Sequence, residues 1–229
     1  MNRRFLIVAC AALFLTGGTP SRAGEVIDRI VATVNGHIIL QSDWDDALRY
    51  EAFVDGRRLD QLPTAERKAA LDRLIDQELL QEQMHSSDFR HASDQEISQR
   101  IQEIRKHYSG TETEPGWQAL LNGYGFTEEG LKQHIAVQMD LLRLVDARLR
   151  PNVSIDPGSI ESYYNKELLP QLRQSGEQEV PLAAASSKIR ELLTQQKVNQ
   201  LLITWLQNLR SGSEIHTDPN ALNPKGELQ

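Results

Sequence analysis

The sequence predicts a mainly α-helical protein, with a multi-helix core, a small N-terminal β-hairpin and a short C-terminal strand. Residues 26–40 contain two runs rich in β-branched residues, separated by the dipeptide Asn35-Gly36. Most of the remaining chain repeats apolar residues at intervals of three and four, as amphipathic helices do. Charged residues make up 25% and hydrophobic residues 39% of the chain, which is typical of a globular protein.

The charge and cysteine content exclude several classes of protein. The net charge of −7 argues against a nucleic-acid-binding protein, because such proteins usually carry a basic face. The single cysteine, Cys10, excludes a disulfide framework within one chain and a cysteine-rich zinc site.

Residues 1–23 have the pattern of a secretory signal peptide. Two arginines, Arg3 and Arg4, precede an apolar run over residues 5–15, and small residues at positions 21 and 23 predict cleavage after Ala23. Cleavage removes three arginines and the only cysteine, which suits export to an oxidising compartment. A short membrane anchor and a lipoprotein signal that uses Cys10 are the alternatives.

The hairpin has a specific predicted register. Asn-Gly favours the positive φ angles of a two-residue type I′ turn. Such a turn pairs Val34 with His37, Thr33 with Ile38, Ala32 with Ile39, and Val31 with Leu40. Both faces of this hairpin are largely apolar, and an isolated hairpin is marginal in water, so other elements must cover it.

Capping residues and apolar stripes predict a series of helices after the hairpin. Ser42 is the expected first N-cap, Ser93 and Glu96 form a capping box, and Thr127 caps a long helix whose stripe includes Leu142. The expected helical ranges are 42–54, 64–85, 93–108, 115–122 and 127–149.

The C-terminal third predicts fewer elements. Asp156-Pro157 is an N-cap followed by proline at the first helical position. Residues 170–185 are polar and predict a loop, and a final helix starts at Ser186 or Ser187 and runs to about residue 210. A short strand over 214–217 and a disordered tail over 218–229 complete the prediction.

The sequence contains no motif for catalysis, a metal or a cofactor. It lacks a His-x-x-x-His pair, a Gly-x-Ser-x-Gly motif, a phosphate-binding glycine loop and a dinucleotide fingerprint. Asp43, Asp45 and Asp46 are interpreted as a helix first turn, where the helix dipole favours negative charge. We therefore expect no catalytic residues, no metal and no cofactor.

One aromatic cluster is a candidate peptide-binding patch. Bulky apolar residues flank the turn at Asn122-Gly123. The candidate groove residues are Trp117, Leu120, Leu121, Tyr124 and Phe126. The alternative interpretation is a buried corner between two helices.

The order of these elements resembles the SurA-type periplasmic chaperones. Residues 26–36 (VIDRIVATVNG) are similar to the opening strand and turn of that family, and residues 38–43 (IILQSD) to its first helix start. Weaker similarities are the helical segments RLIDQELL (73–80), IESYY (160–164), IRELL (189–193) and WLQNLR (205–210).

The resemblance implies a chaperone core over residues 24–217. Within it, 24–149 form an N-terminal helical part, 150–185 a helix and loop, and 186–217 a closing helix and a strand that pairs with the hairpin. Family members commonly insert a parvulin prolyl isomerase domain of about a hundred residues before the closing helix. Here only residues 170–185 occupy that place, so the resemblance supports the chaperone and not the isomerase.

The resemblance implies an ATP-independent periplasmic holdase that binds unfolded outer-membrane or secreted proteins in an apolar groove. Its partners would be unfolded or nascent envelope polypeptides, with no nucleic acid and no stable membrane insertion after signal cleavage. Two alternatives stay open: a dedicated envelope adaptor with one fixed partner, and a peptidyl-prolyl isomerase.

Overall fold

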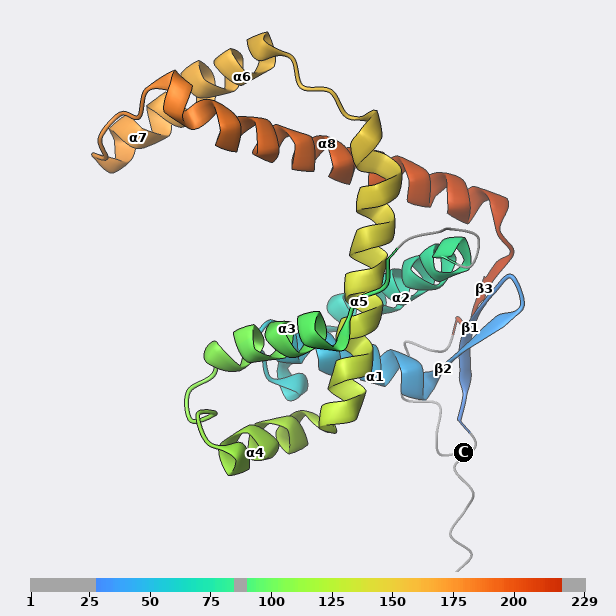
Figure 1. The fold of residues 1–229 in the computed structure, drawn as a ribbon. Coiled ribbons are helices and arrows are strands. Elements are labelled where there is room, and N and C mark those ends of the chain that lie inside the picture. The colour runs from blue at the N-terminus through green and yellow to red at the C-terminus, as the bar shows by residue number, and fades with distance from the viewer. Residues whose placement is uncertain (1–27, 85–89, 220–229) are drawn as a thin grey trace, which may run out of the picture.

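The computed structural model describes residues 28–84 and 90–219. The predicted fold class is confirmed, because helices dominate and a three-stranded antiparallel sheet stands at one end (Figure 1). The predicted signal peptide (1–23) and tail residues 220–229 lie outside the described residues. The described part of the chain contains no helix long and apolar enough to cross a membrane.

The sheet has the order β2-β1-β3, formed by β1 (Ile30–Val34), β2 (His37–Leu40) and β3 (Ile215–Thr217). The predicted turn is confirmed, since Asn35 and Gly36 have φ angles of 49° and 87°. The predicted pairing of β3 with the hairpin is also confirmed, with Thr33 opposite His216.

One of the four predicted hairpin pairs is wrong. Leu40 lies opposite Ile30 instead of Val31, because the register shifts between Ile30 and Ala32. Neighbouring residues of a regular strand point to opposite faces, but Val31 and Ala32 are 0% and 2% exposed. The irregularity allows both side chains to be buried in the same core.

Helix α1 (Gln41–Val54) starts one residue before the expected N-cap, Ser42. The Asp43 carboxylate accepts the Leu40 N–H at 2.8 Å and caps the helix in place of Ser42. The Ser42 hydroxyl instead contacts the Asp28 carboxylate, which also accepts the Ser42 N–H at 3.2 Å. The Ser42 prediction was therefore wrong, because a partner from outside the helix engages its side chain.

The central helices agree more closely with prediction. They are α2 (Thr64–Met84), α3 (Asp94–Lys106), α4 (Glu114–Tyr124) and α5 (Glu128–Leu149). The capping box of Ser93 and Glu96 is confirmed, as is the Thr127 cap, whose hydroxyl accepts the Gly130 N–H at 3.0 Å. Gly125 ends α4 with a φ of 76°, a left-handed conformation that favours glycine.

The predicted loop over 170–185 is wrong. Helix α6 (Pro157–Tyr163) continues through a π-helical turn, η3 (Tyr164–Leu168), into α7 (Leu169–Ser175). Pro170 stands in the first turn of α7, directly after the π-helical turn, where the regular i→i−4 hydrogen-bond ladder is already interrupted. Helix α8 (Leu182–Gly212) begins four residues before Ser186, whose hydroxyl donates back to the Leu182 carbonyl at 2.6 Å.

Helix α8 joins two parts of the molecule. Its N-terminal part packs on α6 through Ile160, Ala185 and Ile189. Its C-terminal part packs on α2 and α5 through Leu202 and Trp205, and then leads into β3. Figure 1 shows α6 and α7 alongside the far end of α8, with α3 and α4 at the opposite end of α5.

Candidate functional site

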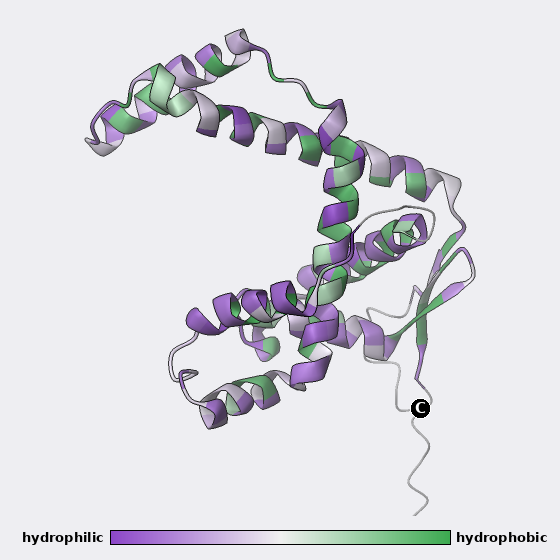
Figure 2. Cartoon of the chain, in the orientation of Figure 1, coloured by the Kyte–Doolittle hydropathy of each residue, from purple (hydrophilic) through white to green (hydrophobic). Residues whose placement is uncertain are grey.

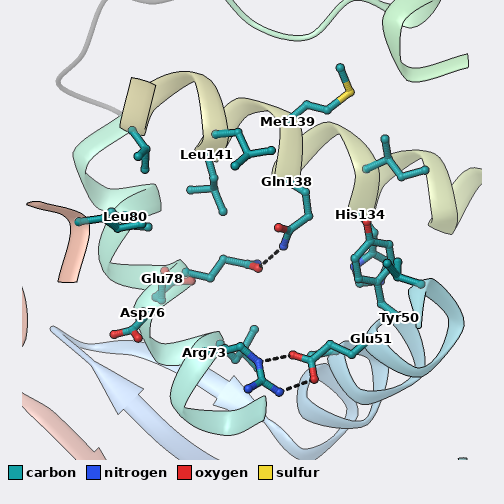
Figure 3. Close-up of a pocket in the computed structure, with 18 of the residues that line it drawn as sticks. Tyr50, Glu51, Arg73, Asp76, Glu78, Leu80, His134, Gln138, Met139 and Leu141 are labelled. Carbon is teal, nitrogen blue, oxygen red and sulfur yellow. Dashed lines mark hydrogen bonds and ion pairs between the residues drawn. The ribbon is translucent and has the colours of Figure 1, made fainter. Parts of the chain in front are cut away.

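A large hollow lies among α1, α2, α5 and α8 and extends to β2. Its volume is about 1930 Å³. Sites that enclose a small molecule have roughly 300–1,000 Å³, so this hollow has room for a segment of polypeptide. Figure 3 shows the part between α1, α2 and α5.

Exposed apolar side chains line the hollow from three different elements. Ile38 on β2 is 56% exposed, Val54 at the end of α1 is 45% exposed and Leu142 on α5 is 68% exposed. The other exposed large apolar residues of the described chain are Ile30, Val180, Leu192 and Ile203, and they lie outside the hollow. Figure 2 shows hydrophobic residues along the hairpin strands and along α5. Covering such a surface with an apolar partner is favourable, because it removes apolar area from water.

Leu142 corrects one prediction about α5. The expected buried stripe included Leu142, but its neighbour Leu141 occupies the buried position at 7% exposure. Leu141 packs with Leu80 of α2 and with Leu144, whereas Leu142 points away from that cluster. Adjacent residues lie about 100° apart around a helix, and here α2 covers the Leu141 side of α5 while the Leu142 side faces the hollow.

The charged and polar groups of the hollow are largely paired with one another. Arg73 donates two hydrogen bonds to the Glu51 carboxylate, at 2.7 and 2.5 Å (Figure 3). These bonds raise the pKa of Arg73 and connect α2 to α1. The Gln138 amide donates to Gln77 at 3.0 Å and connects α5 to α2. The pairing fixes the walls and leaves little net charge to repel an apolar segment.

Aromatic rings form the wall where α1 faces α5. The rings of Tyr50 and His134 line the hollow and stack at 5.0 Å between centroids. The buried ring of Phe126 lies behind them, 5.6 Å from His134 and roughly perpendicular to it. Burial lowers the pKa of His134 and so favours its uncharged imidazole. Burial likewise raises the pKa of Tyr50. This wall therefore presents flat, uncharged surface to the hollow.

The hollow offers apolar surface and hydrogen-bonding groups. Within residues 28–84 and 90–219, no three His, Cys, Asp or Glu side chains lie close enough to hold a metal ion. What the arrangement can do is accept apolar side chains and hydrogen-bond to a polypeptide.

The five residues predicted to bind peptide lie together, but outside the hollow. Trp117, Leu121 and Phe126 are 1%, 0% and 5% exposed and surround Phe53 of α1. Leu120 and Tyr124 pack on the same cluster and are partly buried.

None of these five residues lines the hollow. The Tyr124 hydroxyl donates to the Arg57 carbonyl at 3.1 Å, which anchors α4 to the end of α1. This packing matches the alternative interpretation, a buried helix corner. Trp117 is almost fully buried, and peptide binding at these residues stays a prediction.

Sequence reasoning missed Ile38, Val54 and Leu142 as residues of the hollow, although a signal for Ile38 and Leu142 exists. Ile38-Ile39 and Leu141-Leu142 are adjacent apolar pairs, one in a strand and one in a helix. The members of such a pair point in different directions, to opposite faces in a regular strand and about 100° apart in a helix. A packing partner on one side therefore does not by itself cover the second member.

Comparison with known proteins agrees with the resemblance seen in the sequence. The family described as "SurA-like N-terminal domain" matches residues 3–145. A protein named "Chaperone SurA", from Hahella chejuensis, is 29% identical over 156 residues. That match covers 65% of this chain and 35% of the relative, so the chain aligns with about a third of the relative's length.

Proposed function

The chain belongs to the SurA-like N-terminal domain family, and we propose that it is an ATP-independent periplasmic holdase. In this proposal it binds unfolded outer-membrane or secreted proteins, and residues 24–217 act as one chaperone core. The apolar hollow is the site that holds the client, and no prolyl isomerase activity accompanies it.

The observation that carries this proposal is the grouping of Ile38, Val54 and Leu142 around a hollow of about 1930 Å³. Three exposed apolar side chains on separate elements give a client several anchor points without requiring one fixed sequence. The paired charges of Arg73 and Glu51 keep the walls in place between clients.

The energetics favour reversible capture. Ordering an unfolded segment costs about 2–5 kcal/mol, which offsets much of the gain from apolar burial. The full chain has a net charge of −7, and cleavage after Ala23 removes three arginines and no acids. This negative charge helps a loaded chaperone to remain in solution, because molecules of like charge repel one another. We therefore expect micromolar binding, with fast release.

Two features of the sequence support a periplasmic location. Residues 1–23 carry the charged, apolar and small-residue regions of a signal peptide. A chain cleaved after Ala23 contains no cysteine, which suits an oxidising compartment.

The length and structure of residues 170–185 support the proposed lack of isomerase activity. Residues 170–185, where the family's parvulin domain would be inserted, form most of α7, the connection to α8 and the first turn of α8. These residues are largely helical and are too few to form a separate domain.

Light scattering of a diluted, unfolded outer-membrane β-barrel protein tests the proposal. We expect the purified protein to suppress aggregation without ATP at a near-stoichiometric ratio. A folded preparation that fails to suppress aggregation would contradict the holdase and would favour an adaptor with one fixed partner. A protease-coupled proline-isomerisation assay should give no rate above background.

A further inference from the structure

The hairpin leaves one backbone hydrogen-bonding position uncovered, at Ile38 on the outer edge of β2. In β1, the Val31 carbonyl accepts the Asp218 N–H and the Asn35 N–H donates to the Glu214 carbonyl, both at 2.9 Å. These odd-numbered residues therefore bond towards β3. Neighbouring residues of an antiparallel strand direct their N–H and C=O groups to opposite sides, so even-numbered residues of β1 bond towards β2.

This alternation fixes the direction of the Ile38 backbone. Ile38 lies opposite Thr33, an odd-numbered residue whose hydrogen bonds go to β3. The Ile38 N–H and C=O consequently point away from β1, and no described residue hydrogen-bonds to either group. The next outward donor on this edge, the Leu40 N–H, is already bonded to the Asp43 carboxylate at 2.8 Å. Ile38 is thus the open position of the edge.

The hollow reaches this edge. Ile38 and Ile39, adjacent residues of the edge strand β2, both line it. Asp43 and Ala47 of α1, the helix that directly follows β2, line the same space. The open backbone groups of Ile38 are therefore continuous with the hollow that contains Val54 and Leu142.

We infer that an extended segment of an unfolded polypeptide pairs with β2 as an added strand. The segment exchanges two backbone hydrogen bonds with Ile38, and its side chains on one face enter the hollow. The inference rests on the proposed function, and it identifies the recognised chemistry as the peptide backbone itself. Backbone pairing is independent of side-chain identity, and a one-residue edge limits its strength, as repeated capture and release require.

Proline substitution at position 38 tests this pairing. Ile38→Pro removes the outward N–H without removing a bond to β1, and proline is tolerated at sheet edges. Ile38→Ala is the control for loss of the side chain, because it keeps the N–H. Thr217→Pro is the matched control at the opposite edge, since Thr217 lies opposite Ala32, whose bonds go to β2, and does not line the hollow.

The probe is a fluorescent ten-residue peptide of alternating valine and threonine with a lysine at each end. We expect Ile38→Pro to bind it about fivefold more weakly than Ile38→Ala, as the loss of one backbone hydrogen bond predicts. Thr217→Pro should bind like the wild type. A second peptide with ester linkages in place of its central amides should bind the wild type several-fold more weakly, whether or not the proline variant folds.

The outcomes separate this inference from the proposed function. If the wild type binds peptide and suppresses aggregation, but Ile38→Pro matches Ile38→Ala and the ester peptide binds normally, edge pairing is wrong and the holdase stands. If the wild type neither binds the peptide nor suppresses aggregation, both fail. Weaker binding by Ile38→Pro or of the ester peptide supports the pairing.

Discussion

Replacing Leu142 with glutamine separates client binding from folding. Leu142 is 68% exposed and lines the hollow. Fully burying a leucine side chain contributes about 1.5–3 kcal/mol of favourable free energy. Covering the exposed part of Leu142 therefore contributes about 1–2 kcal/mol to client binding. Glutamine is similar in length and in helix propensity, and it forfeits most of that gain. We therefore expect the client affinity to fall about five- to thirtyfold.

The same substitution should leave the folded state almost unchanged. Exposed substitutions that break no specific interaction usually alter the free energy of unfolding by less than about 0.5 kcal/mol. Ile203→Gln is the matched control, because Ile203 is 58% exposed on α8 but lies outside the hollow. Fluorescence anisotropy of a labelled unfolded client gives the affinity, and urea unfolding gives the stability. Equal affinity losses for the two variants would refute the assignment of the hollow.

Three further predictions concern the framework around the hollow. Phe53→Ala should lower the free energy of unfolding by about 3–5 kcal/mol in urea denaturation, since Phe53 is 0% exposed in an aromatic core. Glu96 has its pKa lowered to about 2 by hydrogen bonds to its capping partner and to Arg143. Ionised Glu96 therefore stabilises the folded state above about pH 4.5, and this stabilisation is lost towards pH 2. The urea midpoint of Glu96→Gln should fall less steeply between about pH 5 and pH 3 than that of the wild type. Arg210→Met removes the 2.5 Å ion pair with Asp76 that holds α8 on α2, and should lower the thermal midpoint and cost about 1 kcal/mol.

Local signals in the sequence predicted most of the secondary structure. The caps at Ser93 and Thr127 depend on residues within four positions, so the sequence alone contains the full interaction. The start of α1 could not be predicted from neighbouring residues, because the Ser42 hydroxyl hydrogen-bonds to Asp28, which is 14 residues away. Pro170 suggested a loop, yet the chain stays helical through it, because a π-helical turn directly before α7 interrupts the regular hydrogen-bond ladder.

The site was harder to predict than the fold, because exposure depends on what packs on each side of a helix. Helix α5 contacts α3 along one part and α8 along another, and this arrangement decides that Leu141 is buried and Leu142 exposed. Trp117 and Phe126 attracted attention as bulky residues near a glycine turn. They are buried because α1 supplies Phe53 as a central partner, a long-range contact that spacing alone does not encode.

Site-specific photo-crosslinking tests the central claim, that the hollow holds the client. A photoreactive amino acid is placed at position 54 or 142 inside the hollow, and at position 192 or 203 on α8 as exposed apolar controls. After illumination with an unfolded outer-membrane protein, we predict strong client adducts from 54 and 142 and background levels from 192 and 203. Adducts of equal yield at all four positions, or adducts confined to the α8 positions, would contradict the account.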